Sequence, residues 1–310
     1  MGVANDWNAP LSSQSPERAT RKFSRHKSRD LIHLSHHQTP SLMIDLGKRN
    51  LLGVNIDALD YEGAISRFMS AAVKGRRYTT TALAVHGVMT GVLDPEHRYR
   101  LNRFDMVVPD GMPVRWGLNW LHRTCLPDRV YGPTLMLKIC EAAAEKATPI
   151  FLFGTDQPTL ESLSSHLLKQ FPKLEIAGME PSKFRKLSQD ESKALSHRIQ
   201  TSGAKITFVG LGCPRQEIWA YEMGDQLNMP LFAVGAAFAF HAGKLSQSPS
   251  WMQKRGLEWL YRLMCEPRRL WRRYLFLNPL YLTLLAMQWT GLNKPDPNST
   301  VEPREQTLYG

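Results

Sequence analysis

Residues 149–154, Pro-Ile-Phe-Leu-Phe-Gly, decide the fold, because a run of large apolar side chains ends there in a glycine. A helical pattern follows over 158–170, in which leucines recur at spacings of three and four. A short strand that is apolar at every position is typical of a parallel sheet covered on both faces. This segment therefore predicts one strand and one covering helix of an α/β fold.

The same alternation continues in both directions along the chain. Upstream, helices are expected over 61–74 and 133–146, with strands over 79–85 and 106–108. Downstream, strands are expected over 174–178, 206–210 and 230–235, with helices over 188–200 and from about 214. The order predicts a Rossmann-like parallel sheet with helices on both faces.

Composition divides the 310 residues into four parts. Residues 1–45 are rich in Ser, His, Arg and Pro and hold few large apolar residues, so they are expected to form a disordered tail. The α/β domain is expected over 46–248 and a basic amphipathic appendage over 249–290. The polar, Pro-rich residues 291–310 are expected to form a second disordered tail.

Several kinds of site are disfavoured by motif spacing. The four cysteines are widely separated and form no CxxC pair, which argues against a disulfide scaffold and a zinc site and fits a reducing cytoplasm. The segment 210–215, Gly-Leu-Gly-Cys-Pro-Arg, lacks the third glycine of a dinucleotide motif. There is no Walker motif and no DxD pair. We therefore expect no metal and no cofactor.

The net charge of +11 is unevenly distributed. Residues 1–40 carry six basic and three acidic residues, and residues 250–275 carry seven basic and two acidic residues. The long middle of the chain is nearly neutral. Since a nucleic-acid-binding domain usually carries its positive charge on the folded body, this distribution argues against a nucleic-acid partner.

The appendage combines basic residues with four of the eight tryptophans, which lie between 251 and 289. The apolar run 274–289 contains Asn278 and Pro279, and it is shorter than the roughly 20 residues that a membrane span needs. Such a segment is typical of a helix lying on an anionic membrane surface. Packing on the core, or contact between two copies in a homo-oligomer, remain the alternatives.

The ends of the predicted strands hold the first candidate site residues. Gly154, Gly210 and Gly235 each close a strand, which would let a ligand approach the carboxyl edge of the sheet. Tight turns are the alternative role. Asp110 ends another strand beside Gly111 and is placed to act as a general base. Its alternative role is to cap the next helix.

The other candidates are polar side chains near helix starts and in the appendage. The C-terminal arginines are spaced by seven and three, so they would share one helical face if Pro267 does not interrupt the helix. Guanidinium groups in such an array could bind a diphosphate, although a solvated basic face is the alternative. These candidates are Arg129, Gln216, Arg262, Arg269 and Arg272.

Four motifs together resemble the WecG/TagA/CpsF family of bacterial glycosyltransferases over roughly residues 50–282. They are Val-Val-Pro-Asp-Gly (107–111), Asp-Arg-Val-Tyr-Gly (128–132), Val-Gly-Leu-Gly-Cys-Pro-Arg-Gln-Glu (209–217) and Gly-Leu-Glu-Trp-Leu-Tyr-Arg-Leu (256–263). The resemblance implies an inverting, metal-independent, UDP-sugar-dependent hexosyltransferase of polysaccharide biosynthesis. Its acceptor would be a polyprenyl-diphosphate-linked sugar, and the enzyme would be cytoplasmic, peripheral on the inner face of the membrane.

Carried over to this chain, the resemblance implies that Asp110 is the base and that Arg129 and Gln216 lie in the substrate cleft. It also implies that the three C-terminal arginines reach the diphosphate. The chain departs from the family pattern at 82–84, 238–240 and 247–249, and these changes concern the identity of the donor sugar. A non-catalytic membrane scaffold in a polysaccharide assembly complex is the alternative function.

Overall fold

The computed structural model describes residues 43–310, except the side chains of Arg269 and Arg273. The N-terminal tail expected from the sequence therefore lies almost entirely outside the described residues. Residues from Leu42 onward form one compact unit.

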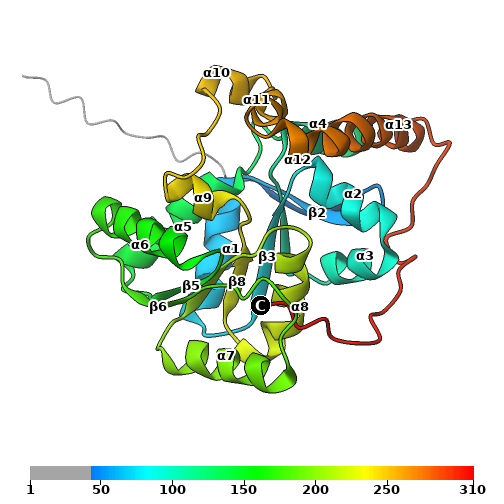
Figure 1. The fold of residues 1–310 in the computed structure, drawn as a ribbon. Helices are drawn as coiled ribbons and strands as arrows, with labels where there is room; N and C mark the ends of the chain where they lie inside the picture. The colour runs from blue at the N-terminus through cyan, green and yellow to red at the C-terminus, as the bar shows by residue number, and fades with distance from the viewer. Residues whose placement is uncertain (1–42) are drawn as a thin grey trace, which may run out of the picture. The chain divides into compact units, whose positions relative to one another are not determined.

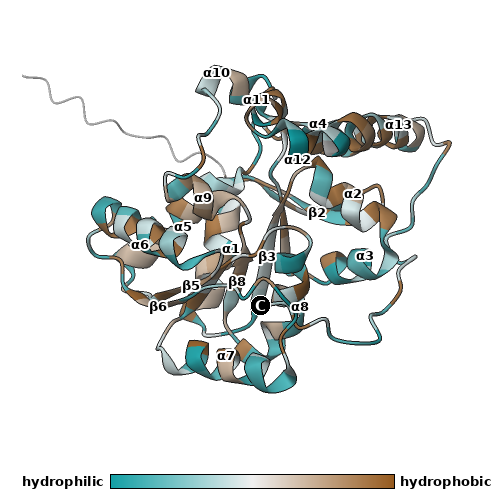
Figure 2. Ribbon diagram, viewed as in Figure 1, coloured by the Kyte–Doolittle hydropathy of each residue, from teal (hydrophilic) through white to brown (hydrophobic). Residues whose placement is uncertain are grey.

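The centre of this unit is a six-stranded sheet in the order β4-β3-β8-β7-β5-β6, in which all paired strands are parallel (Figure 1). The strands are β3 (Tyr78–Leu83), β4 (Met106–Pro109), β5 (Ile150–Gly154), β6 (Ile176–Glu180), β7 (Ile206–Gly210) and β8 (Pro230–Ala233). The inner strands β5, β7 and β8 are mostly apolar because their side chains are buried on both faces of the sheet, as their hydropathy indicates (Figure 2). The inner strand β3 instead buries three threonines, Thr79, Thr80 and Thr81.

Two separate hydrophobic clusters cover the two faces of the sheet. One face packs against α1 (Tyr61–Val73), α5 (Gly132–Glu145), α6 (Gln157–Gln170) and α9 (Ala237–His241). The other packs against α2 (Val85–Leu93), α3 (Pro95–Asn102), α7 (Gln189–Thr201) and α8 (Arg215–Leu227). The predicted Rossmann-like α/β fold is confirmed.

A hairpin of β1 (Asp45–Leu51) and β2 (Val54–Leu59) precedes the sheet and was not expected from the sequence. Its two-residue turn, Leu52-Gly53, has positive φ at both positions, as a type I′ turn requires. Asp57 is fully buried on β2, where a carboxylate oxygen accepts from Val107 N at 2.8 Å. Residues 54–58 alternate between apolar and polar side chains, but β1 is mostly polar and has no such pattern, so the hairpin as a whole carries a weak sequence signal.

The C-terminal appendage is a series of short helices that gather beside α4 (Met112–His122) in Figure 1. They are α10 (Ser250–Lys254), α11 (Glu258–Cys265), α12 (Pro267–Arg272), the π-helical turn η1 (Arg273–Leu277) and α13 (Asn278–Trp289). α13 is anchored by its buried Tyr281 and Leu285, and the Tyr281 hydroxyl donates to Pro113 O at 2.9 Å. Among the described residues, no helix is both long and apolar enough to cross a bilayer.

The segment 291–310 differs from the disordered tail expected from its composition. It runs along the body of the fold and is held by polar groups there: Asn102 donates to Pro297 O at 2.8 Å, and the Glu222 carboxylate accepts from two backbone amides at 2.7 and 2.9 Å. Ser182 donates to the terminal Gly310 at 2.7 Å. Because the segment makes these contacts with backbone atoms, its amino-acid composition does not predict them.

Candidate functional site

A cavity of about 620 Å³ opens at the carboxyl edge of the sheet, beyond β3, β4, β7 and β8. This is the edge at which open α/β sheets bind ligands. Residues of α11 and the helical turn η1, including Trp259 and Tyr274, also line it, so the appendage completes the wall. The sheet side of the cavity includes the small apolar residues Ala82 and Ala84.

Asp110 directly follows β4 and faces this cavity. The next helix, α4, begins after Gly111 without a side-chain cap, so Asp110 does not cap it. Instead its carboxylate accepts from Gly132 N at 2.6 Å, at the start of α5. Burial raises the pKa of Asp110 to about 6, although Arg129 nearby acts in the opposite direction. A carboxyl group with this pKa is largely ionised at neutral pH and is suited to accept a proton.

Arg129 is buried beside Asp110 and is held from three sides. It donates to Asp110 O at 3.2 Å and to the Glu258 carboxylate at 2.6 Å, and it stacks over the Tyr131 ring with its guanidinium carbon 4.3 Å from the centroid. Glu258 lies in the first turn of α11. This ion pair therefore ties the appendage to the cavity.

Gln216 lies in the first turn of α8 and is fixed by its neighbours. Its amide oxygen accepts from Gly212 N at 3.1 Å, and its amide nitrogen donates to Glu217 at 2.8 Å. Glu217 is fully buried and also accepts from Thr81 at 2.9 Å; burial raises its pKa. Gly235 has positive φ, and a Cβ there would lie 3.4 Å from the Gln216 amide.

The fold brings most of the predicted site residues together. Those that line the cavity are Asp110, Arg129, Gln216, Gly210, Gly235 and Arg262. Gly154 is not among them: it packs against the backbone of Gly210, where a Cβ would come within 2.7 Å of the carbonyl carbon. Its requirement for glycine is thus explained by close packing between strands.

The C-terminal arginines do not lie on one face of a continuous helix, contrary to the arrangement that their spacing predicted. α11 ends at Cys265, Glu266 leaves the helical conformation, and α12 starts at Pro267, as expected where a proline breaks a helix. Arg262 faces the cavity, whereas Arg272 is exposed on α12 and does not line it. The side chain of Arg269 lies outside the described residues.

Sequence reasoning assigned no role to Glu258, although it lies in the quoted segment 256–263. The sequence held one signal for this role: Glu258 is an acidic residue within a strongly basic region, where an ion pair with an arginine could be expected. Sequence reasoning also found no metal-ligand spacing, yet the fold gathers His97, Cys213 and Glu217 from separate elements.

These observations define an α/β protein with a cavity at the carboxyl edge of its sheet. The acidic residues that line the cavity are Asp110, Glu217 and Glu258, and the arginines that line it are Arg129, Arg215 and Arg262. The family model described as "Glycosyl transferase WecG/TagA/CpsF family" matches residues 49–295. The chain belongs to this family, as its motifs predict. Membership indicates a glycosyltransferase of cell-envelope polysaccharide synthesis, a class that uses a sugar-nucleotide donor and a lipid-linked acceptor.

Proposed function

We propose that the chain is an inverting hexosyltransferase that moves a sugar from a UDP donor to a polyprenyl-diphosphate-linked sugar. The observation that carries the proposal is the single cavity in which Asp110 faces Arg129 and Arg262. A proton acceptor and two cations at one sheet edge match the charges that develop in glycosyl transfer.

In this mechanism Asp110 takes the proton from the acceptor hydroxyl. That oxygen attacks the anomeric carbon of the donor from the face opposite the UDP group. The bond between the anomeric carbon and the phosphate oxygen breaks, and UDP leaves with the electron pair. Arg262 and Arg129 stabilise the leaving diphosphate through charge-assisted hydrogen bonds, which is the role that a divalent cation has in DxD transferases.

The appendage would hold the enzyme on the inner face of the membrane, where a polyprenyl acceptor is accessible. Large apolar side chains are exposed along it, among them Trp251, Phe276 and Leu282. The appendage also exposes basic residues: Lys254 at the end of α10, Arg255 just after it, and Arg272 on α12. Aromatic and aliphatic residues interleaved with basic ones favour an anionic lipid surface, and Arg272 would contact lipid phosphates there.

The test incubates the full chain with a panel of UDP-sugars and a polyprenyl-diphosphate-linked sugar, with no Mg²⁺ or Mn²⁺ added. Mass spectrometry should find an acceptor larger by one hexose-type residue, and nuclear magnetic resonance of the product should show the anomeric configuration inverted. Addition of Mg²⁺ or Mn²⁺ should not increase the rate. A chain that binds the membrane but forms no product with any donor would instead be the non-catalytic scaffold.

A further inference from the structure

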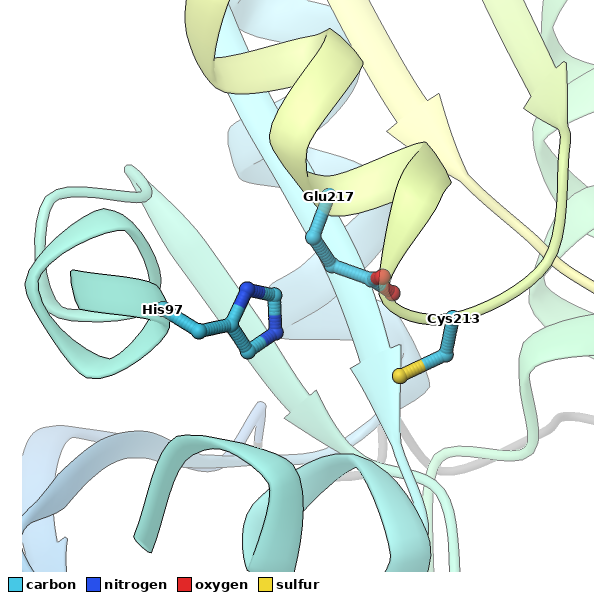
Figure 3. A group of neighbouring side chains, drawn as sticks. All are labelled: His97, Cys213 and Glu217. Carbon is cyan, nitrogen blue, oxygen red and sulfur yellow. The ribbon is translucent and has the colours of Figure 1, made fainter. Parts of the chain in front are cut away.

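Three buried or partly buried side chains lie close together (Figure 3), and two of them, Cys213 and Glu217, also line the cavity. His97 comes from α3, Cys213 from the loop that joins β7 to α8, and Glu217 from the first turn of α8. One potential ligand atom of each lies within 4.8 Å of those of the other two. More than 100 residues separate His97 from the other two, so only the fold brings them together.

This group contains buried polar atoms that the described residues leave unsatisfied. His97 is fully buried, and neither ring nitrogen has a hydrogen-bond partner among them. The first carboxylate oxygen of Glu217 accepts from Thr81 and Gln216. Its second oxygen has no hydrogen-bond partner of good geometry, although the Cys213 thiol interacts with this carboxylate. Buried polar groups are nearly always paired, so such atoms at one point indicate a bound species.

The donor set identifies the class of that species. A thiolate, an imidazole and a carboxylate are the ligands that Zn²⁺ takes in proteins. His97 is fully buried, and a neutral imidazole is the form of histidine that binds metals. The charges also balance, because a divalent cation neutralises one thiolate and one carboxylate, which would otherwise be costly to bury.

We propose that His97, Cys213 and Glu217 bind one Zn²⁺ ion. Ligand atoms around tetrahedral zinc lie about 3.5 Å apart, so the widest pair, within 4.8 Å here, would close by about 1 Å at most. Water would take the fourth position. Binding releases the Cys213 thiol proton to solvent, and no other bond forms or breaks.

The ion would influence the cavity indirectly, by holding in place the loop and helix that carry Gln216. Cys213 and Glu217 flank Gln216, whose side chain lines the cavity. Coordination of both neighbours would fix the β7–α8 loop, including Gly212, whose amide donates to Gln216 at 3.1 Å. This inference does not depend on the proposed transfer reaction, because metal binding is measured without substrate.

The test adds Co²⁺ to the metal-free, reduced full chain, because cobalt bound to a thiolate gives a near-ultraviolet charge-transfer band. We expect the band to saturate at one equivalent and to disappear when Zn²⁺ is added. Cys213→Ser should abolish the band, and His97→Gln should weaken Co²⁺ binding more than about 100-fold. Cys125→Ser and Cys265→Ser are matched controls on exposed thiols and should keep the band.

Two outcomes would overturn the proposal: a folded wild-type chain that gives no thiolate band, or a band that persists in Cys213→Ser. Cobalt bound by the histidines of residues 1–42 would add no such band, since histidine carries no sulfur. If His97→Gln does not fold, as judged by circular dichroism, the measurements on the wild-type chain and on Cys213→Ser still test the proposal.

Discussion

Two carboxyl groups near the cavity have pKa values raised by burial, but their surroundings suit them to different roles. Asp110 lies beside Arg129 and Arg262, whose charges favour its ionised form and partly offset burial. Glu217 is enclosed by neutral hydrogen-bond donors from Thr81 and Gln216. At the residue scale, this difference favours Asp110 over Glu217 for the proposed role of general base.

Asp110→Asn should lower the turnover number roughly 10²–10⁴-fold, the contribution of a general base, while UDP affinity stays near the wild-type value. The amide oxygen of asparagine can still accept from Gly132 N, so the start of α5 should be unchanged. Single-turnover kinetics and calorimetric titration with UDP check the two parts. An Asn variant with normal turnover would remove Asp110 from the role of base.

The pH dependence follows from the same group. The active form of Asp110 is ionised and its pKa is about 6, so kcat/KM should fall tenfold per pH unit below about 6 and level off above it.

The raised pKa of Asp110 also predicts how stability depends on pH. Because the folded-state pKa is raised, the protonated form contributes stability at low pH that is lost as pH rises through about 6. Asp110→Asn should therefore unfold at a higher denaturant concentration than wild type at pH 8. Equal midpoints would contradict this.

Glu258→Gln removes the carboxylate that pairs with Arg129 at 2.6 Å, where the two side chains are 14% and 9% exposed. Breaking such a pair should lower the free energy of unfolding by about 3 kcal/mol. Because Glu258 raises the pKa of Asp110, its loss should also shift the acid limb of the rate profile to lower pH. Denaturant unfolding and pH–rate profiles measure the two effects.

Glu266→Gln is the matched control at the other end of α11. Its carboxylate lies 4.0 Å from Arg262, and the Glu266 side chain is 22% exposed, so it should cost less than about 1 kcal/mol. An acid limb that moves equally in both variants would show that Glu258 has no special influence on Asp110.

At the scale of elements, the sequence predicted those whose apolar pattern is regular. β5 and α6 were predicted to within a residue or two, because nearly every side chain of β5 is buried and α6 has leucines in helical register. The hairpin of β1 and β2 was missed because β1 is mostly polar, and its Lys48 is held by an ion pair with the buried Asp57 of β2, which also pairs with Arg67. The hairpin is stabilised by partners that are distant in the sequence, and a local sequence pattern does not reveal such partners.

The same distinction applies to the candidate site. Asp110 and Gln216 could be predicted because a strand end and a helix start mark them in the sequence. Glu258 could not, since its role depends on the tertiary fold, which brings α11 to Arg129. The break between α11 and α12 also separated arginines that sequence spacing had placed on one face.

α13 offers a matched pair of leucines that can separate the packing role of the appendage from its proposed binding to membranes. Leu285 is 3% exposed and packs on the core, so Leu285→Ala should lower the free energy of unfolding by about 3 kcal/mol. Leu282 is 53% exposed, so Leu282→Ala should change stability by less than about 0.5 kcal/mol yet weaken binding to lipid vesicles. Thermal unfolding and vesicle sedimentation compare them. Similar effects of both variants in both assays would contradict these separate roles.

At the scale of the whole molecule, the charge distribution predicts how the enzyme meets the membrane. Lys254 and Arg255 are exposed at the end of α10, beside Trp251. Each basic residue near an anionic bilayer contributes about 1 kcal/mol, so replacing both with Gln should weaken binding to anionic vesicles about 30-fold. Binding to zwitterionic vesicles should hardly change.

The control replaces Lys169 and Lys173, which are exposed on and just after α6, with Gln. Both double variants remove two positive charges, so a general attraction between a basic protein and an anionic surface would weaken binding equally in both. If the appendage is the docking surface, only the α10 variant should lose affinity, and raising the salt concentration should reduce the difference because charges at an exposed surface are screened. If both double variants lost the same affinity for anionic vesicles, the net charge of +11 as a whole would account for binding, and the appendage would not be the docking surface.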